Sequence, residues 1–200
     1  MVVVEVISNM KPMKLRKKKP ALLLIDIQKG FDDEEYWGGN RNNKDAEHKS
    51  AMILKKWREL NLPIFHILHS STNPLSRLHK SHAGFEIKDE VKPIGGEPVI
   101  EKDVNSTFIG TNLKERLESK GIKDLVIVGL TTNHCVSTST RMAGNLGFHV
   151  LLISDATATF DRMGINGDLF DAETIHQTAL ASLNNEFAKV INTSKLFELI

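Results

Sequence analysis

Six short apolar runs are spread along the chain, and longer stretches of mixed apolar and polar residues separate them. Apolar runs without polar interruption are typical of strands that are buried on both faces, as in a parallel sheet. The last run has the weakest pattern. The predicted strands span residues 21–25, 63–68, 98–101, 125–128, 150–153 and 188–191.

The stretches between these runs show the spacing of amphipathic helices. The clearest of them places Ile53, Trp57 and Leu60 on one face. Another, residues 135–146, has no helix breaker before Gly144. Four helices are expected to begin at side chains that typically cap free backbone N–H groups. The predicted caps are Asp45, Thr111 or Asn112, Asp171 and Thr193.

Strands that alternate with helices predict right-handed crossovers and a doubly wound α/β fold. The expected architecture is a three-layer α/β/α sandwich around a six-stranded, mainly parallel sheet. A length of 200 residues suits one such domain with a sizeable core. In this architecture the loops after the carboxyl ends of the strands build the functional site. The least regular stretches are residues 30–43 and 70–96.

Composition and charge narrow the class of protein. Hydrophobic residues make up 40% of the chain and charged residues 26%, and the net charge of +1 argues against nucleic-acid and membrane-surface partners. The one local excess is the basic stretch from Lys11 to Lys19, for which a targeting or nucleic-acid patch is one interpretation. Because no second basic cluster supports it, we expect a solvated N-terminal arm over residues 1–18 and a folded domain over residues 19–200.

The apolar runs also bear on location. None approaches the ~20 residues that cross a bilayer. Residues 1–10 are too short for a signal peptide and lack a basic stretch ahead of the apolar one. We therefore expect a cytoplasmic protein with no membrane partner. The single cysteine, Cys135, excludes an internal disulfide and a metal cluster built on several cysteines.

Polar residues stand where four of the apolar runs stop: Asp26, His69, Lys102 and Asp155. The carboxyl ends of strands in a doubly wound sheet meet at one edge, so these side chains are expected to converge. Taken singly, each is more simply a cap or a solvated strand end. Together with Cys135 they supply a nucleophile, a base and a cation, which is the combination that hydrolysis by a cysteine uses.

Cys135 follows the sequence Gly-Leu-Thr-Thr-Asn-His and precedes a helical stretch, so its sulfur is predicted to lie near a helix N-terminus. The helix dipole and free N–H groups there favour the thiolate, and a nearby lysine adds to this effect. We therefore expect the pKa of Cys135 to lie below the ~8.5 of a free thiol. The same N–H groups can stabilise an oxyanion. The alternative is a small buried side chain without chemistry.

Four segments resemble motifs of the isochorismatase-like cysteine hydrolases, and they occur in that family's order. Residues 21–28 (ALLLIDIQ) resemble the first-strand motif, and Glu101-Lys102 with Ser106 and Phe108 resembles the lysine segment. Residues 128–136 (VGLTTNHCV) resemble the nucleophile motif, and residues 154–156 (SDA) a late strand end. The resemblance covers roughly residues 19–191, and the motifs together are far more specific than any one of them.

This resemblance implies an Asp-Lys-Cys catalytic triad. Cys135 would be the nucleophile, Asp26 the general base and later the general acid, and Lys102 the cation that holds both in their ionised forms. It also implies a cis peptide bond between Leu130 and Thr131. The backbone N–H of Thr131, together with that of Cys135, would then point toward the oxyanion.

The histidines bear on which branch of the family the chain resembles. Nicotinamidases bind a metal through an Asp-x-His motif after the second strand, whereas this chain has His-Ser-Ser from His69 onward. His66, His69, His79 and His82 are numerous enough to suggest a metal. However, His66 and His69 are three residues apart on a predicted strand and face opposite sides. We expect no metal and no cofactor, a core position for His66 and a pocket position for His69.

The presence of Cys135 favours the amidase-type branch of the family. In that branch a thioester forms, an amine or ammonia leaves, and water releases the acid. The expected partner is therefore a small-molecule substrate, a planar or carboxylated amide. Aromatic residues in loops after Asp26 and Lys102 can line its pocket or pack beneath the loops. The predicted pocket residues are Phe31, Trp37, His69, Phe108 and His134.

Two other functions stay open at this point. Isochorismatases proper cleave a vinyl ether by protonation and need no thiol. The second alternative is a non-enzymatic protein whose thiol senses oxidants or binds a ligand. Sensing does not require the proton shuttle that Asp26 and Lys102 suggest. The resemblance also implies a homodimer or homotetramer whose pockets borrow residues from a neighbouring subunit.

Overall fold

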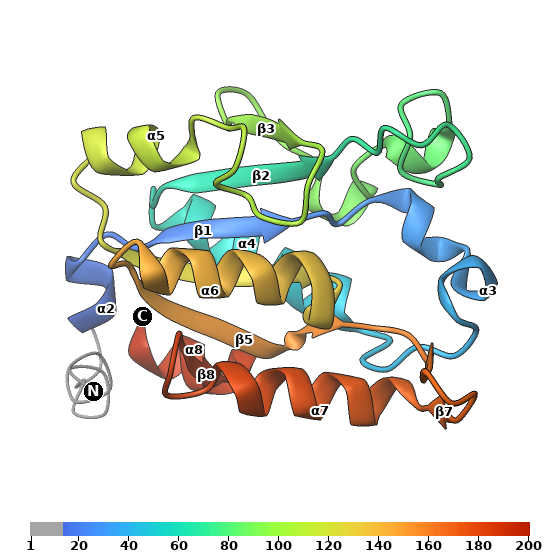
Figure 1. Ribbon diagram of the computed structural model, residues 1–200. Coiled ribbons are helices and arrows are strands. Elements are labelled where there is room, and N and C mark those ends of the chain that lie inside the picture. The colour runs from blue at the N-terminus through green and yellow to red at the C-terminus, as the bar shows by residue number, and fades with distance from the viewer. Residues whose placement is uncertain (1–13) are drawn as a thin grey trace.

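The computed structural model describes residues 14–200. Its centre is a sheet of six parallel strands in the order β3-β2-β1-β4-β5-β8 (Figure 1). All six predicted strands are present, each within a few residues of its expected bounds. The strands are β1 (Ala21–Ile25), β2 (Ile64–His69), β3 (Val99–Lys102), β4 (Asp124–Leu130), β5 (His149–Ala158) and β8 (Lys189–Ile191).

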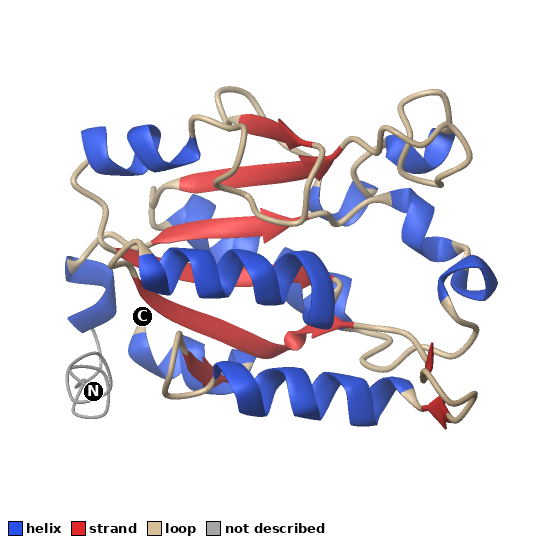
Figure 2. Cartoon of the chain, viewed as in Figure 1, coloured by secondary structure: helices blue, strands red, loops and turns tan. Residues whose placement is uncertain are grey.

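Helices cover both faces of the sheet, which confirms the expected three-layer α/β/α sandwich (Figure 2). One face carries α5 (Leu113–Ser119), α6 (Ser137–Asn145) and α7 (Ala172–Leu183). The other carries α2 (Lys14–Lys17), α4 (Ala46–Glu59) and α8 (Thr193–Leu199). The loops after β1 and β2 hold four shorter segments: η1 (Lys29–Asp32), α3 (Glu34–Trp37), η2 (Ala83–Phe85) and η3 (Asp89–Val91).

The residues of β1 show why the central strands are unbroken apolar runs. Leu23 and Ile25 pack beneath α5, α6 and α7, whereas Leu22 and Leu24 pack beneath α4 on the opposite face. Successive side chains of a strand alternate between faces, so a strand with helices on both sides has no solvent-facing position. Burying each such side chain contributes roughly 1.5–3 kcal/mol relative to leaving it exposed. The first polar residue, Asp26, therefore follows the end of the strand.

The helix starts follow the predicted caps only in part. Asp171 caps α7 as expected, because its carboxylate accepts a backbone N–H of the first turn. Asp45 and Asn112 stand at the N-cap positions of α4 and α5, but neither side chain makes a capping bond. The prediction for Thr193 is wrong. It is the first residue of α8, and Asn192 supplies the cap.

Strand β5 runs further than the apolar pattern indicates, because its register with β4 shifts between Ile127 and Gly129. Asp155 therefore lies inside the strand. Its carboxylate accepts hydrogen bonds from Lys49 Nζ at 3.0 Å and from the Thr193 N–H at 2.8 Å. The expectation that Asp155 converges with the other strand-end residues is wrong, because its side chain bonds to α4 and α8.

The described ends of the chain and one hairpin complete the fold. Part of the arm expected over residues 1–18 forms α2, where Leu15 is 2% exposed and packs into the core, so the arm is not solvated throughout. The rest of that prediction, on residues 1–13, lies outside the described residues. After β5, an antiparallel hairpin of β6 (Arg162–Met163) and β7 (Leu169–Phe170) leads into α7 (Figure 1). No described helix is long and apolar enough to cross a membrane.

Candidate active site

Three strand ends and one turn meet at the carboxyl edge of the sheet. Ile25 at the end of β1 pairs with Ile67 on one side and with Gly129 on the other. His69 and Lys102, the last residues of β2 and β3, pair with each other. The register therefore brings the residue after β1 close to the ends of β2 and β3 and to the turn after β4.

The ammonium group of Lys102 is the centre of this edge. Its Nζ lies 2.7 Å from Asp26 Oδ2, 3.1 Å from His69 Nδ1 and 3.3 Å from Cys135 Sγ. An ammonium has three N–H donors, and here each has an acceptor. The side chains of Asp26 and Lys102 are both 0% exposed, so water does not screen the ion pair. Lys102 thus contacts both Asp26 and Cys135, the other two residues of the expected triad.

Asp26 has an unusual backbone conformation. Its φ of +52° lies in the left-handed region, which costs on the order of 1–3 kcal/mol for a residue other than glycine. Two backbone hydrogen bonds hold it there: its N–H donates to Ile67 O at 3.0 Å, and its carbonyl accepts from the Gln28 N–H at 2.9 Å. Its Oδ1 is buried and has no hydrogen-bond partner among the described residues. The carboxylate therefore retains one free acceptor atom beside Lys102.

The turn after β4 carries the sulfur. The peptide bond between Leu130 and Thr131 is cis, as the resemblance implies. The helix expected from Cys135 begins as one wide π-helical turn, η4 (Thr132–Val136), and continues as α6. The backbone N–H of Thr131 has no acceptor among the described residues. It is therefore free to donate to an oxyanion, the role that the resemblance implies for it.

A close backbone approach requires glycine at position 129. Gly129 has a φ of +129°, and a Cβ there would lie 2.0 Å from the carbonyl oxygen of Ile25. This approach brings the turn with Cys135 against the end of β1, next to Asp26. On the other side of the turn, Thr132 Oγ1 lies 2.9 Å from Nδ1 of His176 on α7. No motif marks His176 as a neighbour of this turn, because it lies on α7, 44 residues after Thr132 in the sequence.

The environment of Cys135 differs from the sequence expectation. Burial raises the pKa of the thiol, the charge of Asp26 raises it further, and Lys102 lowers it without reversing the net shift. The predicted lowering of the pKa is therefore wrong for the resting site, because Cys135 is only 8% exposed and lies beside a carboxylate. These surroundings favour the thiol over the thiolate, and the carboxylate of Asp26 lies within 4.8 Å of the sulfur as the acceptor of its proton.

A cavity of about 300 Å³ opens onto Cys135. Four of the five predicted pocket residues line it: Phe31, Trp37, His69 and His134. Phe108 does not. Its ring packs on Phe148 instead, with the ring centroids 5.9 Å apart, so it belongs to the core. The lining also includes Ser76, Leu78, Asn105 and Thr131, of which the first three have no sequence pattern that marks them.

The aromatic residues form one wall of this cavity. The ring centroids of Phe31 and Trp37 are 4.6 Å apart, and Phe160 stacks on both at 6.2 and 6.4 Å. The indole N–H of Trp37 donates to Gly30 O at 2.7 Å, which fixes the ring. A fixed aromatic wall favours a ligand with a planar group that can stack on one of its rings.

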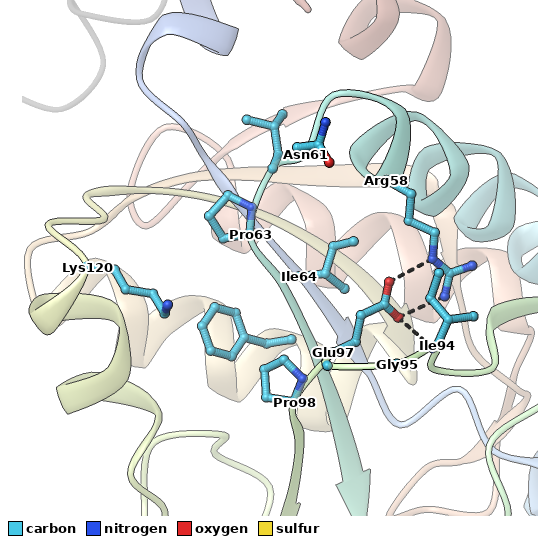
Figure 3. A pocket seen from close by; sticks show the side chains of 12 residues that line it. Arg58, Asn61, Pro63, Ile64, Ile94, Gly95, Glu97, Pro98 and Lys120 are labelled. Carbon is cyan, nitrogen blue, oxygen red and sulfur yellow. Dashed lines mark hydrogen bonds and ion pairs between the residues drawn. The ribbon is translucent and has the colours of Figure 1, made fainter.

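A larger cavity, of about 490 Å³, lies at the opposite edge of the sheet, where β2 and β3 begin (Figure 3). Arg58 forms a bidentate ion pair with Glu97 at its border, at 2.7 and 2.8 Å, and Lys120 lies across from them. His66 Nε2 is 2.9 Å from Glu97 Oε2, and His66 is 1% exposed, so the expected core position of this histidine is confirmed. No residue that lines this cavity is a candidate nucleophile, so the cavity is not the reactive site although it is larger than the one at Cys135.

The histidines do not assemble into a metal site. The rings of His79 and His82 lie in the loop after β2 and bond to Ser81 and Pro74. Among residues 14–200, the one set of three potential ligands is Asp26, His69 and Cys135, whose ligand atoms lie within 4.8 Å of one another. The ammonium of Lys102 is hydrogen-bonded to all three residues, so these potential metal ligands already surround a cation.

Comparison with known proteins gives a consistent picture. The isochorismatase domain profile matches residues 20–195. The isochorismatase family protein YrdC of Bacillus subtilis (strain 168) is 49% identical over 180 residues, which cover 90% of this chain and 95% of YrdC. Nicotinamidase 3 of Arabidopsis thaliana is 28% identical over 209 residues, covering 94% of this chain and 95% of that protein. A crystal structure of an isochorismatase-family protein from Chromobacterium violaceum ATCC 12472 has a TM-score of 0.86 and 41% identity, covering 90% of this chain and 92% of that one. The chain therefore belongs to the isochorismatase family of hydrolases.

Proposed function

We propose that this protein is a cysteine hydrolase that cleaves an amide-type C–N bond of a small molecule through a thioester intermediate. The observation that carries the proposal is the contact of Lys102 Nζ with both Asp26 Oδ2 and Cys135 Sγ in a fully buried centre. A base, a cation and a thiol at these distances can move a proton from sulfur to carboxylate and stabilise the charges that result.

The proposed reaction has two halves. In the first, the Cys135 thiol gives its proton to Asp26 as sulfur attacks the amide carbonyl carbon. The oxyanion accepts hydrogen bonds from the N–H groups of Thr131 and Cys135. The C–N bond then breaks, and Asp26 returns the proton to the leaving nitrogen. In the second half Asp26 takes a proton from water and the water oxygen attacks the thioester. The C–S bond then breaks, Asp26 returns the proton to the sulfur, and the acid leaves.

The cavity favours attack by sulfur over the alternative vinyl-ether reaction. Cys135 lines the cavity, whereas Asp26 does not and is 0% exposed. A substrate held between the aromatic wall and Cys135 would meet the sulfur first. Direct protonation of a vinyl ether by Asp26 would leave the sulfur, the one of the two groups that lines the cavity, without a role.

The cavity also supports a planar substrate with a carboxylate. Phe31 and Trp37 provide the aromatic wall, with their rings tilted by 34° to each other. Beside it, the half-buried guanidinium of Arg162 donates to Trp37 O at 2.9 Å and has no carboxylate partner among the described residues. Burial and the charge of Arg162 together lower the pKa of His134, which lines the cavity. An anionic group on the substrate would supply the missing counter-charge.

The experiment is a panel of small amides assayed for release of ammonia or amine, with and without a chelator. We expect hydrolysis of at least one planar or carboxylated amide, with the same rate in the presence of chelator. Cys135→Ala and Asp26→Asn should lose turnover by several orders of magnitude, whereas Ser81→Ala, in an exposed loop, should retain it. A Cys135→Ala variant that hydrolyses the amide at the wild-type rate would refute the proposal.

A further inference from the structure

Of the three described side chains hydrogen-bonded to Lys102 Nζ, His69 is the one to which the proposed reaction assigns no step. Its Nδ1 lies 3.1 Å from Lys102 Nζ. An ammonium group can only donate a hydrogen bond, so Nδ1 must accept one and cannot carry a proton. A neutral imidazole with a free Nδ1 has its proton on Nε2. The contact with Lys102 therefore selects one of the two neutral forms of the ring.

The surroundings also favour the neutral ring. Burial lowers the pKa of His69, and the neighbouring charge of Lys102 lowers it further. Protonation of Nδ1 would place an N–H group against an ammonium and would break the hydrogen bond. Because Nε2 already carries the ring proton, the ring can gain a second proton only at Nδ1, with that loss. His69 is therefore a poor candidate for a general base.

The backbone of His69 is fixed by a side chain from the first-strand motif. Gln28 is 0% exposed, and its amide makes a closed pair of hydrogen bonds with this residue. Gln28 Oε1 accepts from the His69 N–H at 2.9 Å, and Gln28 Nε2 donates to His69 O at 3.0 Å. The same Nε2 donates to Phe85 O at 2.9 Å. With both backbone groups and Nδ1 engaged, the ring has a fixed position.

The other ring nitrogen, Nε2, is the one that remains available to a substrate. His69 lines the cavity beside Cys135, and its Nε2 has no hydrogen-bond partner among the described residues. Because Lys102 donates into Nδ1, the ring is polarised and Nε2–H becomes a stronger donor. The fixed geometry thus leaves one unpaired N–H group on a residue that lines the reactive cavity.

We propose that His69 is a specificity-determining residue, which presents an Nε2–H donor to the substrate and selects molecules that carry a hydrogen-bond acceptor beside the scissile bond. The acceptor is a carbonyl or carboxylate oxygen. A substrate with an N–H or ammonium group at that position would place donor against donor in a buried site and bind poorly. The proposal rests on the proposed function for its substrate, but the state of the ring can be tested without one.

The first test reads the ring directly. The full-length protein is labelled with ¹⁵N-histidine, and the His69 signals are assigned by their loss in His69→Asn. Two-bond ¹H–¹⁵N correlations distinguish the two neutral forms and the imidazolium. We expect a neutral ring with its proton on Nε2, still neutral at a pH of about 6.5, where half of unperturbed histidines are charged. A proton on Nδ1, or an imidazolium at that pH, would overturn the proposal.

The second test uses two substitutions that separate the acceptor role of Nδ1 from the donor role of Nε2. His69→Asn keeps an acceptor near the Nδ1 position for Lys102 but has no donor toward the cavity. His69→Gln places an amide N–H near the Nε2 position. The probes are succinamate and butanamide, matched amides with and without an additional carboxylate, or the corresponding pair built on whichever amide the wild type hydrolyses.

We expect His69→Asn to lower kcat/KM about tenfold or more for the amide with the acceptor, mainly through KM, and to lower it several-fold less for the amide without one. His69→Gln should restore most of the loss. The rate at which iodoacetamide alkylates Cys135 should stay within about twofold of wild type in His69→Asn, because Lys102 remains hydrogen-bonded. Equal losses for both amides would assign His69 a structural role and overturn the proposal. If no amide is turned over, the proposed function fails, and the NMR result alone decides whether His69 presents the donor.

Discussion

The substitution Lys102→Met tests whether the buried ion pair of Asp26 and Lys102 stabilises the folded protein. The side chains of Asp26 and Lys102 are both 0% exposed and 2.7 Å apart. Removing the cation leaves a carboxylate in the core without a counter-charge, and one of its oxygens already lacks a partner. Breaking a buried pair in this way typically costs about 3–5 kcal/mol. The free energy of unfolding should fall by that amount.

The assay is urea denaturation followed by tryptophan fluorescence. With a slope of about 2 kcal/mol per molar urea, a loss of 3–5 kcal/mol lowers the midpoint by about 2 M. The double variant Asp26→Asn/Lys102→Met buries no charge and should recover most of the loss, although it will be inactive. Lys120→Met, at an exposed position, is the matched control and should change the free energy of unfolding by less than about 0.5 kcal/mol.

Two results would refute this reasoning. A Lys102→Met variant within about 1 kcal/mol of wild type would mean that Asp26 is not buried as a charge beside Lys102. A double variant no more stable than the single one would mean that the loss came from packing around the lysine stem, not from the unpaired carboxylate.

Three further predictions follow from the same site. Burial and the charge of Asp26 raise the pKa of Cys135, so iodoacetamide should alkylate the native protein more slowly at neutral pH than the urea-denatured chain. Asp26→Asn should speed the alkylation. A native rate equal to or above the denatured one would contradict the assignment of a resting thiol. Gly129→Ala should lower the thermal midpoint strongly or prevent folding, because its Cβ would lie 2.0 Å from Ile25 O, whereas Gly95→Ala, which meets nothing within 4 Å, should be nearly neutral in the same melt. Purified protein should contain no stoichiometric zinc or iron by elemental analysis, and one equivalent of metal, with activity lost on chelation, would place the chain with metal-dependent amidases.

Much of the fold could be predicted because its determinants are local. The run at residues 21–25 has no polar position, and only a strand covered on both faces needs that pattern. The strand ends of a parallel sheet lie at one edge, so Asp26, Lys102 and the turn of Cys135 could be brought together before any coordinates were known. His69 and Trp37 could be placed in the pocket because their loops begin at that edge.

What could not be predicted depends on contacts between distant segments. Asp155 looked like a strand end, but a register shift between β4 and β5 places it inside a strand, bonded to Lys49 and Thr193. The pKa of Cys135 depends on how deeply the turn is buried, which a motif does not encode. Gln28 stood within a recognised motif, yet its hydrogen bonds to His69, 41 residues away, required the folded chain.

The buried charges were also hidden in the sequence. Glu47 at the start of α4 pairs with Arg41 and, across 41 residues, with Lys88 at 2.6 Å. All three are at most 7% exposed, although charged side chains of this kind are usually assigned to the surface. Arg41 also lies over the ring of Phe160, with 6.0 Å between the guanidinium carbon and the ring centroid. This network supports the aromatic wall of the cavity from behind.

Mass spectrometry of the intact protein, quenched during turnover of an amide that it hydrolyses, tests the central claim most directly. The account predicts a mass increase equal to the acyl group on the wild-type chain, located on Cys135 by peptide mapping and absent in Cys135→Ala. The Asp26→Asn variant should accumulate no adduct, because it has no carboxyl group to protonate the leaving nitrogen. Turnover without any adduct, together with a Cys135→Ala variant that reacts at nearly the wild-type rate, would contradict a thioester mechanism.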